Sequence, residues 1–366
     1  MNSQLFQNNN KGDNKNMNST SIRLTTVSLT LAMAILAMAS ATTQAADIGT
    51  TYLQLPISLE SGKQKVVGAV LARPVLKKAE VVSAVSSGNV FTSSESLAAY
   101  VPVTTAIAGF TGSDYQLAPA SDDHYIVEFT SGPHTGLLKR VTAISGTSVT
   151  VSGNLPVIDA GTRFVLRKDH TLASLFGDQT SATASGILAG SAAGSADQFG
   201  IFNASGKLVR FFLRSGAGWR DSADRNGVNR NHVRVSMGTG VLMLPAGNKT
   251  IYLNGEYRGT RSKISITEAN SFLANPYPVA VTLANSGLAG YLLKGSAAGS
   301  ADQIRFMESG KFIPYFANNS SDFKLASNRT GPSQSAKEIA PGEGFAVLKA
   351  GSTARDVAWA PQYLAQ

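Results

Sequence analysis

The nine residues GSAAGSADQ at Gly190–Gln198 occur again without change at Gly295–Gln303. Shorter matches follow at almost the same offset, including Trp219-Arg220 with Phe323-Lys324. Identity over nine residues, with aligned matches downstream, predicts one structural unit that is present twice in the chain.

The size of this repeat indicates two lobes. The copies begin 105 residues apart, whereas solenoid repeats have periods of roughly 20 to 50 residues. We expect a first lobe at residues 171–275 and a second at residues 276–366. Their junction falls at Asn275-Pro276-Tyr277-Pro278, because proline restricts its own backbone and that of the residue before it. Segments rich in β-branched residues lie between the shared blocks, which favours antiparallel strands in each lobe.

The residues before the repeats have a strand pattern of their own. Tyr125–Thr130, for example, runs into the glycine-containing turn Ser131–Gly136. Alternating apolar and polar residues between such turns predict strands and hairpins. We therefore predict an all-β protein, with an N-terminal β-barrel or sandwich at residues 47–170. Helical signals are scarce, and Thr171–Phe176 is among the best of them.

Composition removes several classes of chemistry. The 366 residues include 35 glycines, 13 prolines and no cysteine. Disulfides, thiolate metal sites, iron–sulfur clusters and a thiol nucleophile are therefore excluded. Charged residues make up 15% of the chain, below the usual share of about 25%, so we expect packed globular units.

The start of the chain has the pattern of an export signal. Arg23 precedes the apolar run Leu24–Ala39, and small residues up to Ala46 form a candidate signal-peptidase site. A transmembrane anchor is the alternative, but it needs roughly 20 apolar residues. We predict a cleaved signal peptide at residues 1–46, with translation starting at Met1 or Met17. The expected location is periplasmic, cell-surface or extracellular, with no transmembrane segment after cleavage.

Positions kept in both copies are those that the fold is expected to need. Trp219 and Phe323 are interpreted as core or edge aromatic residues, with platforms for sugar rings as the alternative. Asp224 and Asn328 each precede a glycine by three residues, which is typical of a turn whose glycine adopts a positive φ.

Motifs for nucleotides and metals are incomplete. No lysine-hydroxyl pair closes GSAAGSADQ as a phosphate-binding loop requires, so we interpret it as a tight loop in which Asp197 and Asp302 cap the next strand or turn. A calcium loop centred on Gly227 has Val233 where a glutamate is required, and only an irregular calcium site remains as an alternative. No histidine pair has the spacing of a zinc motif.

The densest cluster of possible acid, base or metal-binding groups is Asp122-Asp123-His124 with Glu128. A solvated loop entering a strand commonly carries such residues, and we favour that interpretation. We assign no catalytic residue, no metal ligand and no cofactor.

Positive charge is concentrated in the first lobe. Residues 201–265 contain eleven basic and three acidic side chains, and eight of the eleven are arginines. Four of these arginines are replaced in the second copy; the pairs are Arg210/Pro314, Arg214/Asn318, Arg230/Gln334 and Arg234/Glu338. Because the planar guanidinium grips carboxylate, sulfate or phosphate at two points, we predict an anion-binding face, with an ordinary solvated basic face as the alternative. Its candidate residues are Arg210, Arg214, Trp219, Arg220, Arg230 and Arg234.

Five short motifs carry a family resemblance: Glu128–Gly132, Thr171–Gly177, Ala196–Gln198, Trp219-Arg220 and Pro341–Phe345. On these motifs the chain resembles an uncharacterised family of exported, β-rich bacterial proteins seen chiefly in Verrucomicrobia and their relatives. The resemblance covers most of the chain after the signal and implies export and a β fold. It implies no activity, cofactor or catalytic residue.

These features favour a secreted or cell-surface protein that binds a partner or has a structural role without catalysis. The expected partner is an anionic polysaccharide, glycan or other envelope component, because export makes nucleic acid a poor candidate. The alternative is a carbohydrate-active enzyme with dispersed Asp and Glu residues, which requires two facing carboxylates roughly 5 to 10 Å apart.

Overall fold

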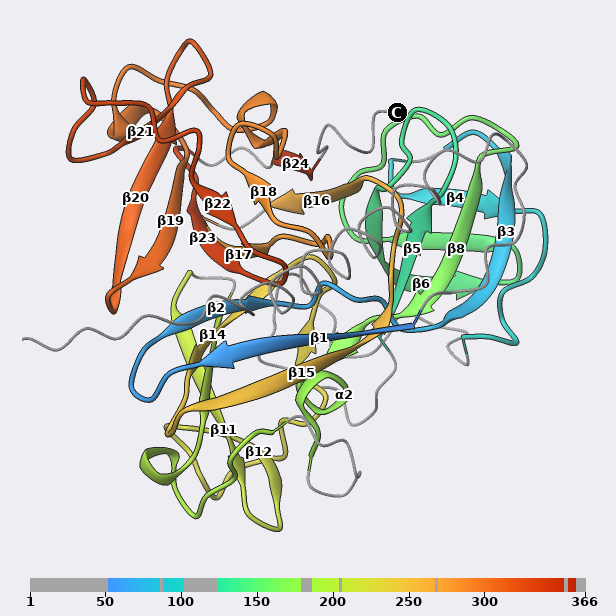
Figure 1. Cartoon of the computed structure of the whole chain (residues 1–366). Coiled ribbons are helices and arrows are strands. Elements are labelled where there is room, and N and C mark those ends of the chain that lie inside the picture. The colour runs from blue at the N-terminus through green and yellow to red at the C-terminus, as the bar shows by residue number, and fades with distance from the viewer. Residues whose placement is uncertain are drawn as a thin grey trace, which may run out of the picture. The chain divides into compact units, whose positions relative to one another are not determined.

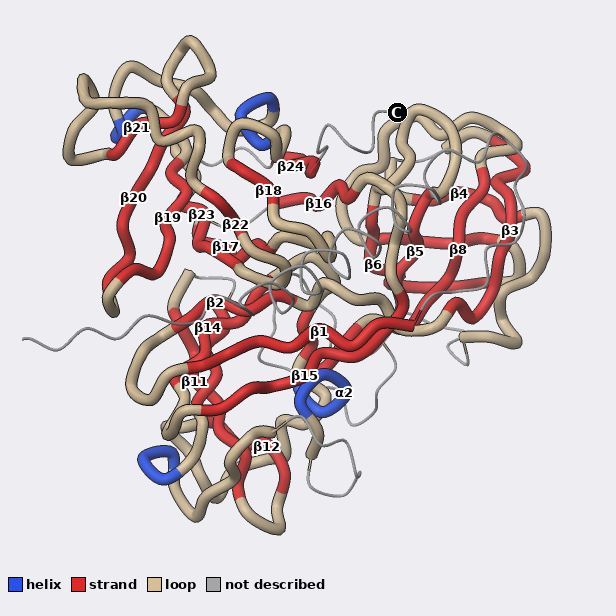
Figure 2. Tube along the Cα trace, in the orientation of Figure 1, coloured by secondary structure: helices blue, strands red, loops and turns tan. Residues whose placement is uncertain are grey.

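The computed structural model of the chain describes residues 52–85, 88–101, 124–178, 186–203, 206–266, 269–351 and 355–359. The predicted signal peptide at residues 1–46 lies outside them. Strands dominate this part of the chain, and its helices are single short turns (Figure 2). The predicted all-β fold class is confirmed. None of the helices in these residues has the length and hydrophobicity needed to cross a membrane.

Of the barrel or sandwich predicted near the N-terminus, the structure has the barrel, which is closed and has six strands in the order β3-β4-β7-β6-β5-β8 (Figure 1). The strands are β3 (Val75–Ser83), β4 (Val90–Ser93), β5 (Tyr125–Phe129), β6 (Leu138–Ser145), β7 (Ser148–Val151) and β8 (Arg163–Lys168). Phe91, Phe129 and Phe164 pack against one another in its core, with ring centroids 5.1 to 6.3 Å apart. Side chains therefore fill the interior of the barrel.

Lobe 1 is our name for strands β1, β2 and β9 to β15. A five-stranded sheet in the order β12-β11-β10-β14-β2 is accompanied by the strand pairs β1-β15 and β9-β13. The strands are β1 (Tyr52–Leu59), β2 (Lys65–Gly68), β9 (His170–Thr171), β10 (Gln198–Phe202), β11 (Leu208–Arg214), β12 (Gly218–Asp221), β13 (Arg234–Val235), β14 (Gly240–Leu244) and β15 (Lys249–Glu256). The predicted short helix is α2 (Leu172–Phe176), which Thr171 caps by accepting from the amide of Ser174.

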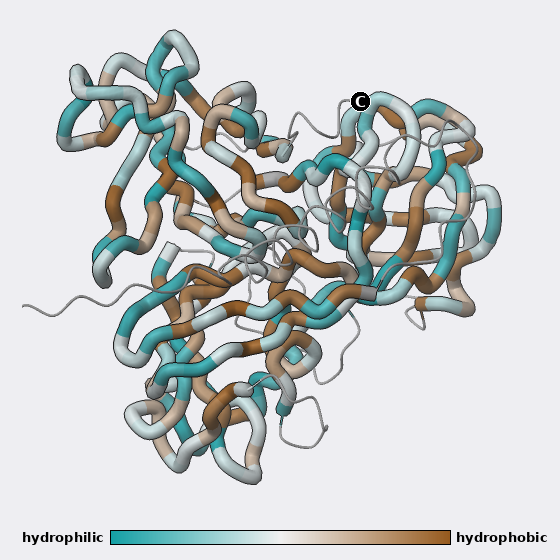
Figure 3. The backbone as a smooth tube through the Cα atoms, in the orientation of Figure 1, coloured by the Kyte–Doolittle hydropathy of each residue, from teal (hydrophilic) through white to brown (hydrophobic). Residues whose placement is uncertain are grey.

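Lobe 2 is our name for strands β16 to β24. It has a five-stranded sheet in the order β17-β23-β19-β20-β21 and the strand pairs β16-β24 and β18-β22. The strands are β16 (Ser262–Ile266), β17 (Asn270–Ala274), β18 (Val281–Thr282), β19 (Gln303–Glu308), β20 (Lys311–Ala317), β21 (Phe323–Leu325), β22 (Glu338–Ile339), β23 (Gly344–Leu348) and β24 (Arg355–Trp359). In every part of the molecule, apolar stretches alternate with polar ones along the strands (Figure 3).

Corresponding strands have the same neighbours in the two lobes. The order β12-β11-β10-β14-β2 matches β21-β20-β19-β23-β17. Hydrogen bonds recur too: the amide of Arg230 donates to Trp219 O, and the amide of Gln334 donates to Phe323 O, both at 2.8 Å. The pairing crosses the expected domain limits, because β1 and β2 belong to the lobe 1 sheets and β16 and β17 to the lobe 2 sheets. The barrel strands thus lie, in chain order, between β2 and β9 of lobe 1.

The lobes meet where β2 and β17 end their sheets. The amide of Gly68 donates to Gly342 O at 3.0 Å, and the amide of Ala274 donates to Gly238 O at 3.3 Å. Both acceptor glycines have a positive φ, 80° for Gly238 and 69° for Gly342. Reciprocal bonds between equivalent positions are the pattern of a two-fold contact.

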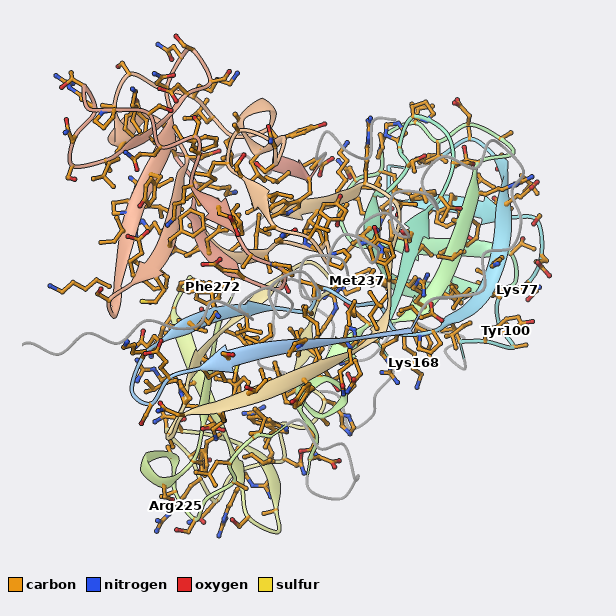
Figure 4. All side chains as sticks on the ribbon, viewed as in Figure 1. Lys77, Tyr100, Lys168, Arg225, Met237 and Phe272 are labelled. Atoms are coloured by element: carbon orange, nitrogen blue, oxygen red, sulfur yellow. The ribbon has the colours of Figure 1, made fainter. Side chains whose placement is uncertain are left out.

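Apolar side chains from both five-stranded sheets form one cluster at this contact. Its buried members are Val66, Leu242, Phe272 and Ala346. Phe202 of lobe 1 stacks on Phe272 of lobe 2 with ring centroids 4.4 Å apart, and Figure 4 shows where Phe272 lies. Burial of these rings stabilises the contact in addition to its hydrogen bonds.

Candidate anion-binding face

Several basic residues in the range 201–265 form ion pairs with carboxylates of the described chain. The pairs are Arg234 with Asp169, Lys249 with Asp197, Arg258 with Glu128 and Lys263 with Asp356. Their charge is already compensated, so these four add little to an anion-binding surface.

Arg234 accordingly leaves the predicted anion-binding set. Its partner Asp169 is fully buried and also accepts the backbone amides of His170 and Met237, both at 3.0 Å. A buried carboxylate needs such partners, so the role of Arg234 is structural.

Trp219 also leaves the set, because its side chain is fully buried. Its indole Nε1 donates to Gly177 O at 2.7 Å, and its ring packs edge-on against Phe199 with centroids 4.8 Å apart. The interpretation of Trp219 and Phe323 as core aromatic residues is confirmed, since both are inaccessible to solvent. Neither ring offers a platform for a sugar.

Three predicted arginines lie together on one face of the β11–β12 hairpin. Side chains alternate between the faces of a strand. Phe211 and Leu213 of β11 point into the lobe 1 core, so Arg210 and Arg214 lie on the opposite face. Arg220 of β12 pairs with Phe212 and shares that face. We call Arg210, Arg214 and Arg220 the arginine face.

No carboxylate within the described residues forms an ion pair with any member of the arginine face. Arg214 Nη1 donates to Arg225 O at 2.9 Å and to Asn226 Oδ1 at 3.1 Å, and Arg220 Nη1 donates to Trp219 O at 3.2 Å. All these acceptors are neutral, so they orient the guanidinium groups without cancelling their charge. Arg225, on the exposed loop after β12, lies at the lower edge of Figure 4.

Arg230, the last predicted member, lies beside the same hairpin through its backbone bond to Trp219 O. Ser222 was not predicted as a member of this face. Its amide donates to Arg210 O at 2.8 Å, which continues the β11–β12 register and sets Ser222 opposite Arg210 on the arginine face. Only the register reveals this, because the pairing partner lies twelve positions away in the chain.

The cluster around Glu128 is not a solvated loop, and that interpretation is wrong for its described members. His124 and Glu128 are both 2% exposed; Asp122 and Asp123 lie outside the described residues. Glu128 Oε1 accepts from Arg258 Nη2 at 2.7 Å, Arg258 Nε at 2.9 Å and Thr260 Oγ1 at 2.8 Å. Arg167 Nε lies 3.5 Å from Glu128 Oε2, and its Nη1 donates to Glu256.

This network joins the barrel to the lobes. Glu128 and Arg167 belong to barrel strands, Glu256 ends β15, and Arg258 lies on the segment that connects lobe 1 to lobe 2. Burial raises the pKa of the Glu128 carboxyl, but the charges of Arg258 and Arg167 and the hydrogen bonds from Arg258 and Thr260 together lower it by more, so the pKa lies below its ordinary value of 4.5. Glu128 is therefore a buried carboxylate that holds two arginines in place.

The repeated segment forms the same tight loop twice. Asp197 Oδ2 accepts the amide of Leu188 at 2.7 Å and its Oδ1 that of Ala246 at 2.8 Å. Asp302 accepts the amides of Leu293 and Ala350 in the same way, both at 2.8 Å. Both aspartates cap backbone amides, but these amides lie nine residues before them and 48 or 49 residues after them, and not in the next strand or turn as predicted.

Replacement of Asp197 or Asp302 by asparagine is expected to lower the free energy of unfolding by about 2 kcal/mol in each case, because a side-chain N–H then faces a backbone N–H. Urea unfolding checks this. Asp159→Asn, at an exposed loop position, is the control and should have little effect. Equal stability of all three variants would contradict the capping role.

The turn after β12 differs in one respect from its prediction. The amide of Gly227 donates to Asp224 O at 3.2 Å, as a turn requires, but Gly227 is not among the glycines with positive φ. A Cβ at Gly227 would lie 2.2 Å from Asp224 Oδ2, so a larger residue there would displace the exposed Asp224 side chain. No group of three or more metal-ligating side chains is found in the described part of the chain.

Comparison of the chain with protein-family models, with curated proteins and with solved structures found no match. The functional argument therefore depends on the geometry of the arginine face.

Proposed function

We propose that the protein is a non-catalytic binding protein that holds an anionic polymer or glycan of the cell envelope on the arginine face. The observation that carries this proposal is the presence of three guanidinium groups on one sheet face without a carboxylate partner in the described chain. Arginine in this setting favours two-point contacts with carboxylate, sulfate or phosphate groups.

The matching face of lobe 2 supports the assignment by contrast. Pro314 and Asn318 stand where lobe 1 has Arg210 and Arg214. Lys324 stands where lobe 1 has Arg220, and it is already bound by Asp322 and by Gly331 O, each at 2.9 Å. The fold therefore does not need arginines at these positions, which points to a role in binding.

The buried carboxylates support binding over catalysis. Glu128, Asp169, Asp197, Glu256 and Asp302 are the buried acids of the described chain. Each accepts from an arginine, a lysine or backbone amides. These contacts account for them as structural groups.

Export and duplication belong to the same proposal. The signal-like residues 1–46 support delivery to the periplasm, the cell surface or the medium, where acidic polysaccharides are available. The identical segments and matching strand orders support an origin of the lobes from one duplicated unit, with the barrel inserted into the first copy.

Replacement of both Arg210 and Arg220 by serine is expected to weaken binding to immobilised heparin at least about tenfold at low salt, because two charge-assisted contacts are lost. The measurement is the salt concentration at which the full chain elutes. Lys311→Ser with Arg329→Ser removes the same charge from exposed positions of lobe 2 and should change elution little. Equal shifts for both double variants would mean that net charge alone controls retention, and the arginine face would be rejected.

A further inference from the structure

We infer that the arginine face contains a defined subsite for one oxyanion group, formed by Arg210, Arg220 and Ser222. This inference rests on the proposed function and deepens it, because it separates a shaped contact from general attraction between opposite charges.

Two unsatisfied polar atoms mark the subsite. Arg220 Nε and Ser222 Oγ are both shielded from solvent and have no hydrogen-bond partner among the residues that the structure describes. An unpaired buried donor lowers the free energy of unfolding by about 1 to 3 kcal/mol. Two such atoms therefore point to a role other than stability. Both residues are themselves only partly buried, and the inference requires their side chains to rotate between staggered rotamers so that these atoms reach a bound anion.

The register brings the three side chains together. Ser222 lies directly opposite Arg210, and Arg220 is two residues before Ser222 on the same strand face. Diagonal neighbours in an antiparallel pair lie about 7 to 8 Å apart at their backbones, within reach of arginine side chains. Phe212, paired with Arg220, is fully buried between these positions. In the proposed subsite, an oxyanion bound over Phe212 would accept from two guanidinium groups and one hydroxyl.

Lobe 2 shows which of these features the fold can omit. Ala326 occupies the position of Ser222, because its amide donates to Pro314 O at 2.9 Å as that of Ser222 donates to Arg210 O. Alanine therefore fits this position of the sheet. The Ser222 hydroxyl of lobe 1 has no hydrogen-bond partner within the described part of the chain, and in the proposed subsite it donates to the bound anion.

The test uses two single variants of the full chain, Ser222→Ala and the charge-conserving Arg220→Lys. Affinity for heparin is measured by calorimetry, alongside inorganic sulfate and glucuronate, which distinguish a sulfated from a carboxylated ligand. We expect each variant to bind at least about tenfold more weakly, because each loses a hydrogen bond to a charged group. Ser222→Ala is also expected to unfold at the same or higher urea concentration, since it removes an unpaired hydroxyl, and a purely structural serine would not show this combination.

The outcomes separate the two claims. If both variants bind heparin as the wild type does, while Arg210→Ser with Arg220→Ser loses binding, the face acts by charge alone and the subsite is rejected. If the wild type binds sulfate or glucuronate in a Ser222-dependent manner but no polyanion, the subsite stands and the proposed function fails. If the wild type binds none of these probes, both are rejected.

Discussion

Replacement of Glu128 by glutamine is expected to lower the free energy of unfolding by about 3 to 5 kcal/mol, because it leaves two buried arginines without their full counter-charge. Arg167 and Arg258 are 8% and 3% exposed at their side chains, so water cannot replace the lost partner. Glutamine has the shape of glutamate, and the loss therefore reports charge and hydrogen bonding.

The loss of unfolding free energy in Glu128→Gln should also depend on pH, which gives a second test of the same prediction. The folded-state pKa of Glu128 lies below the ordinary value of 4.5, so its stabilising effect is complete above pH 4.5 and is lost as the pH falls through the lowered pKa. The difference between wild type and Glu128→Gln should be large at neutral pH and should shrink as the pH falls below 4.5 through the lowered pKa. Urea unfolding over a series of pH values from neutral downward measures it.

Glu80→Gln is the matched control. Glu80 belongs to the same barrel and lies 3.3 Å from Arg163, but the two side chains are 50% and 69% exposed. Exposed pairs contribute about 0 to 1 kcal/mol, so this variant should be nearly as stable as the wild type. A similar decrease in the free energy of unfolding for Glu80→Gln and Glu128→Gln would show that burial does not make the Glu128 network more stabilising than an exposed pair.

Replacement of Gly68 by alanine is expected to lower the free energy of unfolding by about 3 kcal/mol, the upper part of the range for overpacking. The new Cβ would lie 1.9 Å from Ala274 Cβ. Neither atom is the end of a flexible side chain, so relief requires the backbones of β2 and β17 to separate and the reciprocal hydrogen bonds between the lobes to lengthen.

A compensating variant makes this prediction specific. Gly68→Ala with Ala274→Gly moves the single methyl group across the two-fold contact, and we expect it to recover most of the lost stability. Gly247→Ala is the control, because a Cβ at Gly247 has no neighbour within 4 Å. Failure of the double variant to recover stability would refute the two-fold packing of Gly68 on Ala274.

The sequence predicted those features that depend on local pattern. Alternation and glycine-rich turns indicated the strands of the barrel. The segment Thr171–Phe176 was among the best helical signals, and the duplicated GSAAGSADQ indicated a tight loop. In each case, residues close together in the chain determine the backbone conformation.

Pairing between strands that are far apart in the chain could not be predicted from the sequence. Nothing within Lys65–Gly68 shows that it adds a strand to a sheet formed by residues 198–244. The buried position of Glu128 was missed as well, because its counter-ion Arg258 is 130 residues away.

The candidate site shows the same division. The sequence by itself determined that arginines accumulate in one copy of a duplicated unit, because composition and repeat alignment need no coordinates. Only the tertiary structure decided which of these arginines have no carboxylate partner. In the folded chain, Arg234 forms an ion pair with the buried Asp169 and Trp219 is part of the core. Arg210, Arg220 and Ser222 lie on one face of the hairpin. The physical reason is that charge is a property of each residue, whereas burial and ion pairing depend on neighbours that the fold brings from distant parts of the chain.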